Sequence, residues 1–284
     1  MTRSPLAPAI LAACAAGAQA QDWLDNFNDG SATDGTPVMW VSSPGFGAEF
    51  DVLDADLHVT MDDDTISSPR VGNYFPTGAS VRARMIGING PGRYTVAFAD
   101  EPTGIKGYVA SFSTCQGGRI ELFRGDRLGS IVYLGGGPVL WPYSPEEEFI
   151  IQLDVFNGVV SARVWRPGEP FPEPQISAPD ANYPDGVASI AIQDFGGDNP
   201  GGCSAGGDTT DAAAIVRYAQ TSSIPLTHSG CADFNADGST NTLDVLTFLN
   251  AWASSHPNAD FNADGTVNTL DVLAFLNAWT SGCA

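Results

Sequence analysis

The feature that most constrains the fold is a repeat close to the C-terminus. Two segments recur with a period of 27 residues, the first from Ala232 to Trp252 and the second from Ala259 to Trp279. In each segment, oxygen-bearing side chains fall at positions 1, 3, 5, 9 and 12 of a twelve-residue loop, and position 6 is glycine. Calcium takes about six to eight oxygen ligands, and a twelve-residue loop with glycine at its sharp turn supplies them at this spacing.

We therefore predict two calcium ions, one in each loop. Position 7 would contribute a backbone carbonyl and the other positions their side chains. The predicted ligands are Asp233, Asn235, Asp237, Ser239, Asn241 and Asp244 in the first loop, and Asp260, Asn262, Asp264, Thr266, Asn268 and Asp271 in the second.

The placement of the acidic residues distinguishes these loops from a generally acidic surface. From residue 228 to residue 284 there are six acidic residues, all at loop positions 1, 5 or 12, and there is no lysine or arginine. Carboxylates that converge without a counter-charge repel one another, so a cation favours closure of the loops. We expect calcium binding to be coupled to folding of this segment.

Each loop is followed by an expected helix with two apolar faces. One stripe has the spacing i, i+3, i+4 and i+7 and is predicted to pack the helices together: Val245, Phe248, Leu249 and Trp252, matched by Val272, Phe275, Leu276 and Trp279. A second stripe lies roughly 140° away on the helix and is a candidate docking surface. It contains Leu243, Leu246 and Asn250 in the first repeat and Leu270, Leu273 and Asn277 in the second. The alternative is that these leucines pack against the rest of the protein or against each other.

The pattern D-x-N-x-D-G-x-x-N-x-x-D, present twice with a helix after each loop and none before it, resembles the type I dockerin family. The terminal Gly282-Cys283 and the repeated Asn-Thr-Leu-Asp-Val-Leu core are similar to the GC-type dockerin-like domains of exported bacterial proteins. The resemblance implies a cohesin-like partner, recognised through loop positions 10 and 11, which are Thr242-Leu243 and Thr269-Leu270. Because Leu249-Asn250 and Leu276-Asn277 replace the basic pair of cellulosomal dockerins, a surface-anchoring or sorting role is the alternative.

The chain between residues 22 and 220 has the pattern of an antiparallel β-sandwich. Apolar and polar residues alternate in Ala79–Met85, which is typical of a strand with one buried face. Asn157-Gly158 between two apolar runs predicts a tight hairpin, and Gly90-Pro91-Gly92 and Arg124-Gly125-Asp126 are further expected turns. The other expected strands are Arg93–Ala99, Gly107–Ser113, Arg119–Phe123, Ser130–Leu134, Phe149–Phe156, Val159–Trp165, Ala188–Gln193 and Ala213–Ala219. We predict an all-β jelly roll followed by a small α-helical module.

The N-terminus has the features of a secretory signal. Arg3 precedes an apolar stretch from Leu6 to Ala16, and Ala18-Gln19-Ala20 offers a cleavage site. The alternative is a lipobox ending at Cys14, with that cysteine acylated. We expect a signal peptide over 1–20, a sandwich over 21–220, a linker over 221–230 and the calcium module over 231–284. No later segment has the ~20 apolar residues of a membrane helix, so we expect a secreted protein, extracellular or at the cell surface.

Export makes disulfides possible. Without Cys14 four cysteines remain, which allow three pairings. The pairing that respects the expected domain division is Cys115 with Cys203 and Cys231 with Cys283.

The net charge argues against one class of partner. The formal charge is −21, from 33 acidic and 12 basic residues, and no basic stripe is present. Such a surface repels phosphate backbones, so we expect no nucleic-acid partner.

Two segments resemble concanavalin-like or laminin G-like jelly rolls. They are Asp25–Gly30, which Trp40 follows, and the predicted hairpin Val160–Pro170. This resemblance implies carbohydrate binding, in some members a structural calcium, and in others glycoside hydrolysis.

A carboxylate pair would favour the enzyme. Retaining glucanases of this fold carry E-x-D-x-x-E on one strand, because double displacement needs two carboxyl groups about 5 Å apart. No such run exists here: Glu121 stands alone in its strand, and Glu146-Glu147-Glu148 are expected in a polar turn. We therefore favour a non-catalytic carbohydrate-recognition sandwich. The alternatives are an O-glycosyl hydrolase of polysaccharide catabolism with dispersed carboxylates, and an adhesive or structural surface protein.

Other motifs are weaker. Aromatic residues near expected loops are candidates for sugar stacking, although core packing explains them as well: Trp141, Tyr143, Trp165 and Tyr183. The acidic residues Asp51, Asp54, Asp56 and Asp62–Asp64 are expected at a solvated surface or a weak cation site. Gly202–Gly206 fits G-x-S-x-G but lies in an expected loop, and the histidines His58, His228 and His256 lack metal-ligand spacing.

Overall fold

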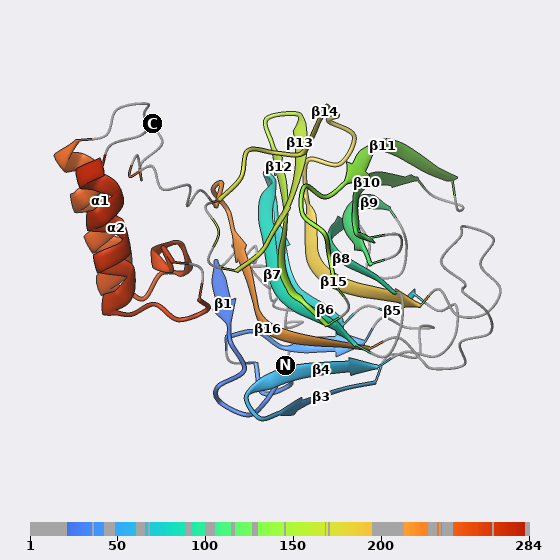
Figure 1. Cartoon of the computed structure of the whole chain (residues 1–284), viewed down its shortest axis with the longest axis horizontal. Helices are drawn as coiled ribbons and strands as arrows, with labels where there is room; N and C mark the ends of the chain where they lie inside the picture. The colour runs from blue at the N-terminus through green and yellow to red at the C-terminus, as the bar shows by residue number, and fades with distance from the viewer. Residues whose placement is uncertain are drawn as a thin grey trace, which may run out of the picture.

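The computed structural model describes residues 22–35, 37–42, 49–60, 66–67, 69–88, 92–99, 106–114, 117–126, 130–144, 146–167, 169, 171–194, 213–226, 232, 234, 241–262 and 264–281. Sixteen strands are followed by two helices (Figure 1). The strands form two antiparallel sheets of eight strands each.

The first sheet has the order β14-β13-β12-β7-β16-β4-β3, and β1 pairs with β16 beside this path. Its strands are β1 (Trp23–Asp25), β3 (Glu49–Leu53), β4 (Asp56–Thr60), β7 (Ala79–Ile88), β12 (Glu148–Phe156), β13 (Val159–Trp165), β14 (Ile176–Pro179) and β16 (Ala213–Ser222).

The second sheet has the order β11-β10-β9-β8-β15-β6-β2, and β5 pairs with β15 beside this path. Its strands are β2 (Trp40–Ser42), β5 (Ile66–Ser67), β6 (Pro69–Phe75), β8 (Gly92–Ala99), β9 (Gly107–Ser113), β10 (Arg119–Asp126), β11 (Ser130–Pro138) and β15 (Gly186–Asp194). Each strand predicted from the alternating pattern is present, and the jelly-roll sandwich is confirmed.

The core lies between the two sheets because every second residue of the central strands points inward. In β12, Phe149, Ile151 and Leu153 are buried in this core. The ring of Phe149 meets that of Phe112 from β9, with centroids 4.5 Å apart, so aromatic contacts join the sheets directly.

The predicted hairpin at Asn157-Gly158 is confirmed, whereas another expected turn is not. Phe156 pairs with Val159, and both central residues have positive φ, +52° at Asn157 and +74° at Gly158, as a two-residue hairpin requires. Arg124–Asp126 is instead the end of β10, paired with β11, so the expectation of a turn there is wrong. The Arg124 guanidinium forms an ion pair with Asp180, which follows β14 of the other sheet.

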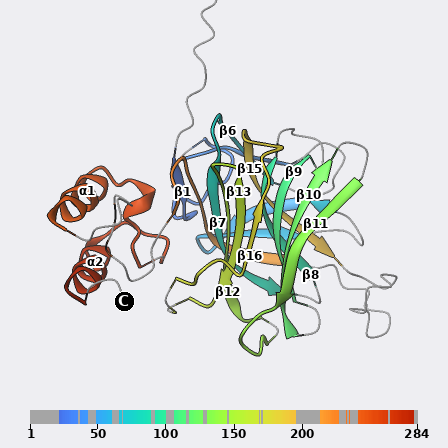
Figure 2. The ribbon, with the colours of Figure 1, turned by 90° about the horizontal axis from the view of Figure 1, so that it is seen from above.

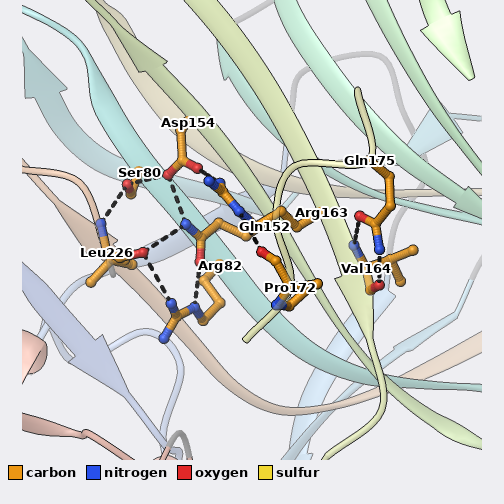
Figure 3. A network of polar contacts seen from close by, with 9 residues as sticks. All are labelled: Ser80, Arg82, Gln152, Asp154, Arg163, Val164, Pro172, Gln175 and Leu226. Atoms are coloured by element: carbon orange, nitrogen blue, oxygen red, sulfur yellow. Dashed lines mark hydrogen bonds and ion pairs between the residues drawn. The ribbon is translucent and has the colours of Figure 1, made fainter. Parts of the chain in front are cut away.

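The segment that leaves β16 is fixed to the outer face of the first sheet (Figure 3). The Leu226 carbonyl accepts hydrogen bonds from Gln152 Nε2 at 3.0 Å and from Arg82 at 3.4 Å, and its N–H donates to Ser80 Oγ at 2.9 Å. Leu226 is buried. The first residues of the expected linker are therefore part of the sandwich surface, and 227–231 lie outside the described residues.

The C-terminal module contains α1 (Thr242–Ala253), a 3-10 turn η2 (Pro257–Ala259) and α2 (Thr269–Ser281). Phe248 and Phe275 are fully buried and stack with centroids 4.2 Å apart and an interplanar angle of 6°. Phe234 and Phe261 contact this pair edge-on. Figures 1 and 2 both show the two helices beside β1, at one side of the sandwich.

Part of the predicted helix core is wrong. Leu249 and Leu276 are 41% and 40% exposed, although the i+4 spacing had assigned them to the packed stripe. At about 100° per residue, Leu249 lies outside the arc of roughly 60° on either side of Phe248 that contacts the other helix. Ala251 lies within that arc and packs against the module core instead.

None of the helices in the described part of the chain combines the length and the apolar character needed to cross a membrane.

Candidate calcium-binding and docking module

The second loop is closed around the side chain of Asp260. The Asp260 carboxylate accepts the backbone N–H of Asp264 and of Gly265, each at 3.0 Å. Gly265 has φ +89°, a left-handed conformation that glycine adopts without strain. The predicted glycine at loop position 6 therefore stands at the turn.

Asp271 connects both arms of this loop to α2. One carboxylate oxygen accepts the N–H of Asn262 at 3.1 Å and the other accepts the N–H of Asn268 at 2.7 Å. Asn268 Oδ1 in turn accepts the N–H of Leu270, so loop positions 9 and 12 also cap the helix. Asn241 and Asp244 form the same capping box at the start of α1. The pattern predicted these residues as ligands, but their second role as helix caps was not anticipated.

The carboxylates of the second loop are crowded and partly buried. Asp260 is fully buried, and burial together with the carboxylates of Asp271 and Asp264 raises its pKa to about 7. Burial also raises the pKa of Asp271. A divalent cation among these oxygens would offset the repulsion that disfavours their charged forms, so the residues fit such an ion.

The ligand set predicted for this loop is mixed. Among the described residues, no three or more His, Cys, Asp or Glu side chains are gathered as a metal-binding cluster. The remaining predicted ligands are an amide or a main-chain carbonyl, at Asn262, Asn268 and Thr266. Of the first loop, Asn241 and Asp244 are described, whereas Asp233, Asn235, Asp237 and Ser239 lie outside the described residues.

A pair of tryptophans links the two repeats. Trp252 Nε1 of α1 donates to the carbonyl of Asn268 at 2.8 Å, and Trp279 Nε1 of α2 donates to the carbonyl of Asn241 at 3.2 Å. Each helix thus holds the N-cap of the other, as expected for two repeats related by a pseudo-twofold axis. The equal spacing of tryptophan and asparagine in both repeats could have indicated this reciprocal contact.

The sandwich offers a second candidate surface, on the outward side of β8, β9 and β10. The Arg93 guanidinium lies 3.1 Å from the Glu121 carboxylate and 5.4 Å from the ring centroid of Phe123. Phe123 packs on Tyr133 of β11, which is 52% exposed. Among the described side chains on this side of β8 to β11, Glu121 is the one carboxylate.

The aromatic residues predicted as sugar-stacking candidates have other roles. Tyr143 and Trp165 are buried, Trp165 against Phe171 at 5.3 Å. Trp141 stacks on Phe112, and Tyr183 packs edge-on against Tyr108. Core packing accounts for all four. The exposed aromatic residues Tyr133 and Tyr74 were missed because each lies within a strand.

The remaining acidic candidates are mostly paired. Asp54 and Ala55 form the tight turn between β3 and β4, and Arg217 forms ion pairs with Asp56 and Glu148. Glu148 begins β12, so its expected place in a turn is wrong. His58 lies in β4 and His256 pairs with Asp22. Asp62–Asp64, Gly202–Gly206 and His228 lie outside the described residues, as do all five cysteines.

The sequence of the module decides its family. Residues 232–279 match the model of the dockerin type I domain. The C-terminal module is a type I dockerin domain. No curated protein matches the chain.

Solved structures resemble the sandwich that precedes the dockerin domain. A prokaryotic β-1,3-1,4-glucanase (lichenase) derived from a mouse hindgut metagenome has a TM-score of 0.51 and 12% identity, over 72% of this chain and 99% of that chain. A structure described with endo-acting O-glycanases, which prominent members of the human gut microbiota express to initiate mucin breakdown, has a TM-score of 0.50 and 12% identity, with the same coverage. At these identities the likeness shows the fold.

Both helices of the dockerin domain expose an apolar stripe. Leu243 and Leu246 are 56% and 57% exposed, and Leu270 and Leu273 are 55% and 58% exposed. The neighbouring predicted docking residues Thr242, Asn250, Thr269 and Asn277 are also exposed. Within the described residues these leucines are therefore not packed on the sandwich or on each other, and their docking role stays a prediction.

Proposed function

We propose that this dockerin-bearing protein is exported, binds two calcium ions in its dockerin domain, and recognises carbohydrate through its β-sandwich. The crowded carboxylates of the second loop carry the calcium part of this proposal. Type I dockerin domains bind calcium, and burial together with the carboxylates of Asp271 and Asp264 raises the pKa of Asp260, an effect that a divalent cation would offset. The equivalent positions of the first loop would hold the second ion.

The dockerin domain would anchor the protein. Its exposed leucine stripes, present on both helices, form an apolar surface suited to a cohesin-like or another surface-anchoring protein. A pull-down with the full chain tests this, in calcium and in chelator. Leu243→Asp with Leu270→Asp should abolish capture, and Leu53→Asp, which changes an exposed leucine of the sandwich, should not. Capture that is unaffected by the double variant would refute docking through these stripes.

Carbohydrate recognition is supported by the fold and by one surface. Solved structures with this fold include a lichenase and a structure described with O-glycanases. On the outward side of the second sheet, Tyr133 in β11 offers an exposed ring, and the pair of Arg93 in β8 and Glu121 in β10 offers charged hydrogen-bonding groups. An aromatic face beside fixed polar groups is the combination that sugars require.

A glycan array tests the carbohydrate part. We expect binding that Tyr133→Ala reduces about fivefold or more, because one stacked ring contributes on the order of 1 kcal/mol or more. Val159→Ala, an exposed apolar residue of the other sheet, is the matched control and should bind as the wild type does. If no glycan is bound, or if Tyr133→Ala has no effect, this surface is not the site.

The same surface argues against glycoside hydrolysis. That reaction needs two carboxyl groups about 5–10 Å apart, whereas Glu121 is engaged by Arg93 and has no second carboxylate among the described side chains around it. A hydrolase would instead release reducing sugar from mixed polysaccharides, and Glu121→Gln would abolish that release.

Export and disulfide pairing belong to the same proposal. N-terminal sequencing of the secreted protein should begin at Gln21, and a lipid-modified Cys14 would contradict it. Peptide mapping under non-reducing conditions should show Cys115 linked to Cys203 and Cys231 linked to Cys283. The domains proposed at 21–220 and 231–284 would then each contain one disulfide of their own.

A further inference from the structure

The second calcium loop of the dockerin domain lies directly on the sandwich. Asn26 Nδ2, next to β1, donates to the carbonyl of Gly265 at 3.0 Å, across 239 positions of sequence. The ring of Tyr218 in β16 packs against the same glycine, so closely that a Cβ at Gly265 would lie 2.7 Å from Tyr218 Cδ1. We name this contact between the sandwich and the dockerin domain the seam, and we include in it the turn from His256 to Ala259 that precedes the loop.

The turn before the loop adds a hydrogen bond between His256 and Asp22 to the seam. His256 Nε2 lies 3.2 Å from Asp22 Oδ2, and the other oxygen of Asp22 accepts the N–H of Ser223 at 2.6 Å. These hydrogen bonds and the His256 partner lower the pKa of Asp22 against the effect of its burial. The seam is thus joined at two points, one on the loop and one on the turn.

The buried polar groups of the seam face the acidic loop. Arg82 is fully buried in β7, and its charge interacts favourably with Asp260, the first residue of the second loop. The Tyr218 hydroxyl and Asn258 Oδ1 are buried and have no hydrogen-bond partner among the described residues. Each such group loses its hydrogen bonds to water without replacement, so the seam is only weakly stable and depends on its few good contacts.

The hydrogen bond between Asn26 and Gly265 depends on the shape of the loop. The Gly265 carbonyl is directed toward Asn26 by the left-handed turn at loop position 6, one residue before the predicted carbonyl ligand at Thr266. The chain reaches the module through a tether from Leu226, which is fixed on the sandwich, to Ala232, and this tether spans at most about 20 Å. The second loop therefore stays within reach of the sandwich even when the contact between them is broken.

We propose that the sandwich is a binding partner of the second calcium loop, so that calcium in this loop fixes the orientation of the dockerin domain on the sandwich. The two repeats are nearly identical in sequence, but the contacts above all come from the second loop and the turn before it. Loss of calcium would release the seam, and the dockerin domain would then move on its tether. This inference rests on the proposed calcium site.

The test compares the full chain with a variant changed on the sandwich side only. Asp22→Ala with Asn26→Ala removes the hydrogen bonds to His256 and to Gly265 but leaves every predicted calcium ligand in place. Asn28→Ala, an exposed residue two positions from Asn26, is the matched control. Small-angle X-ray scattering measures the radius of gyration in calcium and in chelator, calorimetric titration counts the ions, and circular dichroism reports the helices.

In calcium, the wild type and Asn28→Ala should have a radius of gyration near the ~18 Å of one compact body of this size. Chelation should increase it. The double variant should have the larger radius even in calcium, with intact helices and two bound ions. Its second loop should bind calcium about two- to tenfold less tightly, because the hydrogen bond that holds Gly265 of this loop is lost. Should the double variant melt early, Asn26→Ala alone serves the same comparison.

Two results would overturn the inference in distinguishable ways. If two ions bind but neither chelation nor the double variant changes the radius of gyration, the seam is not coupled to calcium, and the proposed calcium site stands. If no ion binds, the proposed calcium site fails and the coupling fails with it.

Discussion

The aromatic core of the dockerin domain gives the sharpest stability prediction. We expect Phe248→Ala to unfold the domain, even in saturating calcium. Phe248 is fully buried, stacks on Phe275 at 4.2 Å, and is contacted edge-on by Phe234 and Phe261. Removal of such a ring costs about 3–5 kcal/mol, from lost burial and from the cavity left behind.

That cost is comparable to the whole stability of the domain. The residues that match the dockerin model, 232–279, number 48, and folded domains have roughly 0.05–0.15 kcal/mol of stability per residue, which gives about 2–7 kcal/mol here. Leu249→Ala is the matched control, one position along the same helix. Because Leu249 is 41% exposed and outside the core, its removal should cost about 0.5 kcal/mol or less.

Differential scanning calorimetry of the full chain in calcium separates the two outcomes. The wild type and Leu249→Ala should show a transition for the dockerin domain and one for the sandwich. Phe248→Ala should retain the sandwich transition only and should lose helical circular dichroism. Equal effects of the two substitutions would refute the helix packing described above, because they would place Leu249 in the core as well.

Three further predictions follow from the other contacts. Trp252→Phe removes the hydrogen bond to Asn268 and should lower dockerin stability by about 1 kcal/mol in a thermal melt, whereas no change would mean that the bridge between the repeats is not formed. Hydrogen bonds to Asp180, among them one from Arg124, lower its pKa to about 2 against burial, so the stability it contributes is present above pH ~4 and is lost toward pH 2. Asp180→Asn should thus be less stable than the wild type at pH 7, with a gap that closes in acid. Burial raises the pKa of Asp25 to about 6. The stability that its protonated form contributes is therefore present below pH ~4 and is lost as the pH rises through 6. The wild type should lose stability relative to Asp25→Asn over that range. For either residue, the prediction would be contradicted if denaturant titrations gave the same difference in unfolding free energy between wild type and variant at every pH.

Much of the fold was predictable because the pattern of each element is local. Alternation in Ala79–Met85 identified β7, and Asn157-Gly158 identified the hairpin between β12 and β13. The strands of the N-terminal part were missed because they are short or because acidic residues interrupt them, as in β3 and β4 with Asp51 and Asp56.

The helices show where periodicity is insufficient. A stripe with the spacing i, i+3, i+4 and i+7 placed both Phe248 and Leu249 in the core, but the neighbouring helix covers only the side centred on Phe248. Which edge of an apolar stripe is buried depends on the position of the partner helix, and the sequence of one helix does not contain that information.

The loop of the candidate site was predictable from the sequence, and its surroundings were not. The spacing of Asp260 to Asp271 specified the loop, since each ligand position is fixed relative to the others within twelve residues. The contact between Asn26 and Gly265 joins residues 239 positions apart and has no local pattern. The electrostatic interaction between Arg82 of the sandwich and Asp260 of the dockerin domain likewise has no local pattern in the sequence.

Calorimetric titration of the full chain with calcium tests the central claim most directly. The wild type should bind two calcium ions. Asp260→Asn should bind one, because it replaces the buried carboxylate around which the second loop closes, and Asp233→Asn should also bind one through the corresponding position of the first loop. If the wild type binds no calcium, or if it still binds two ions after Asp260→Asn, these loops are not the calcium sites.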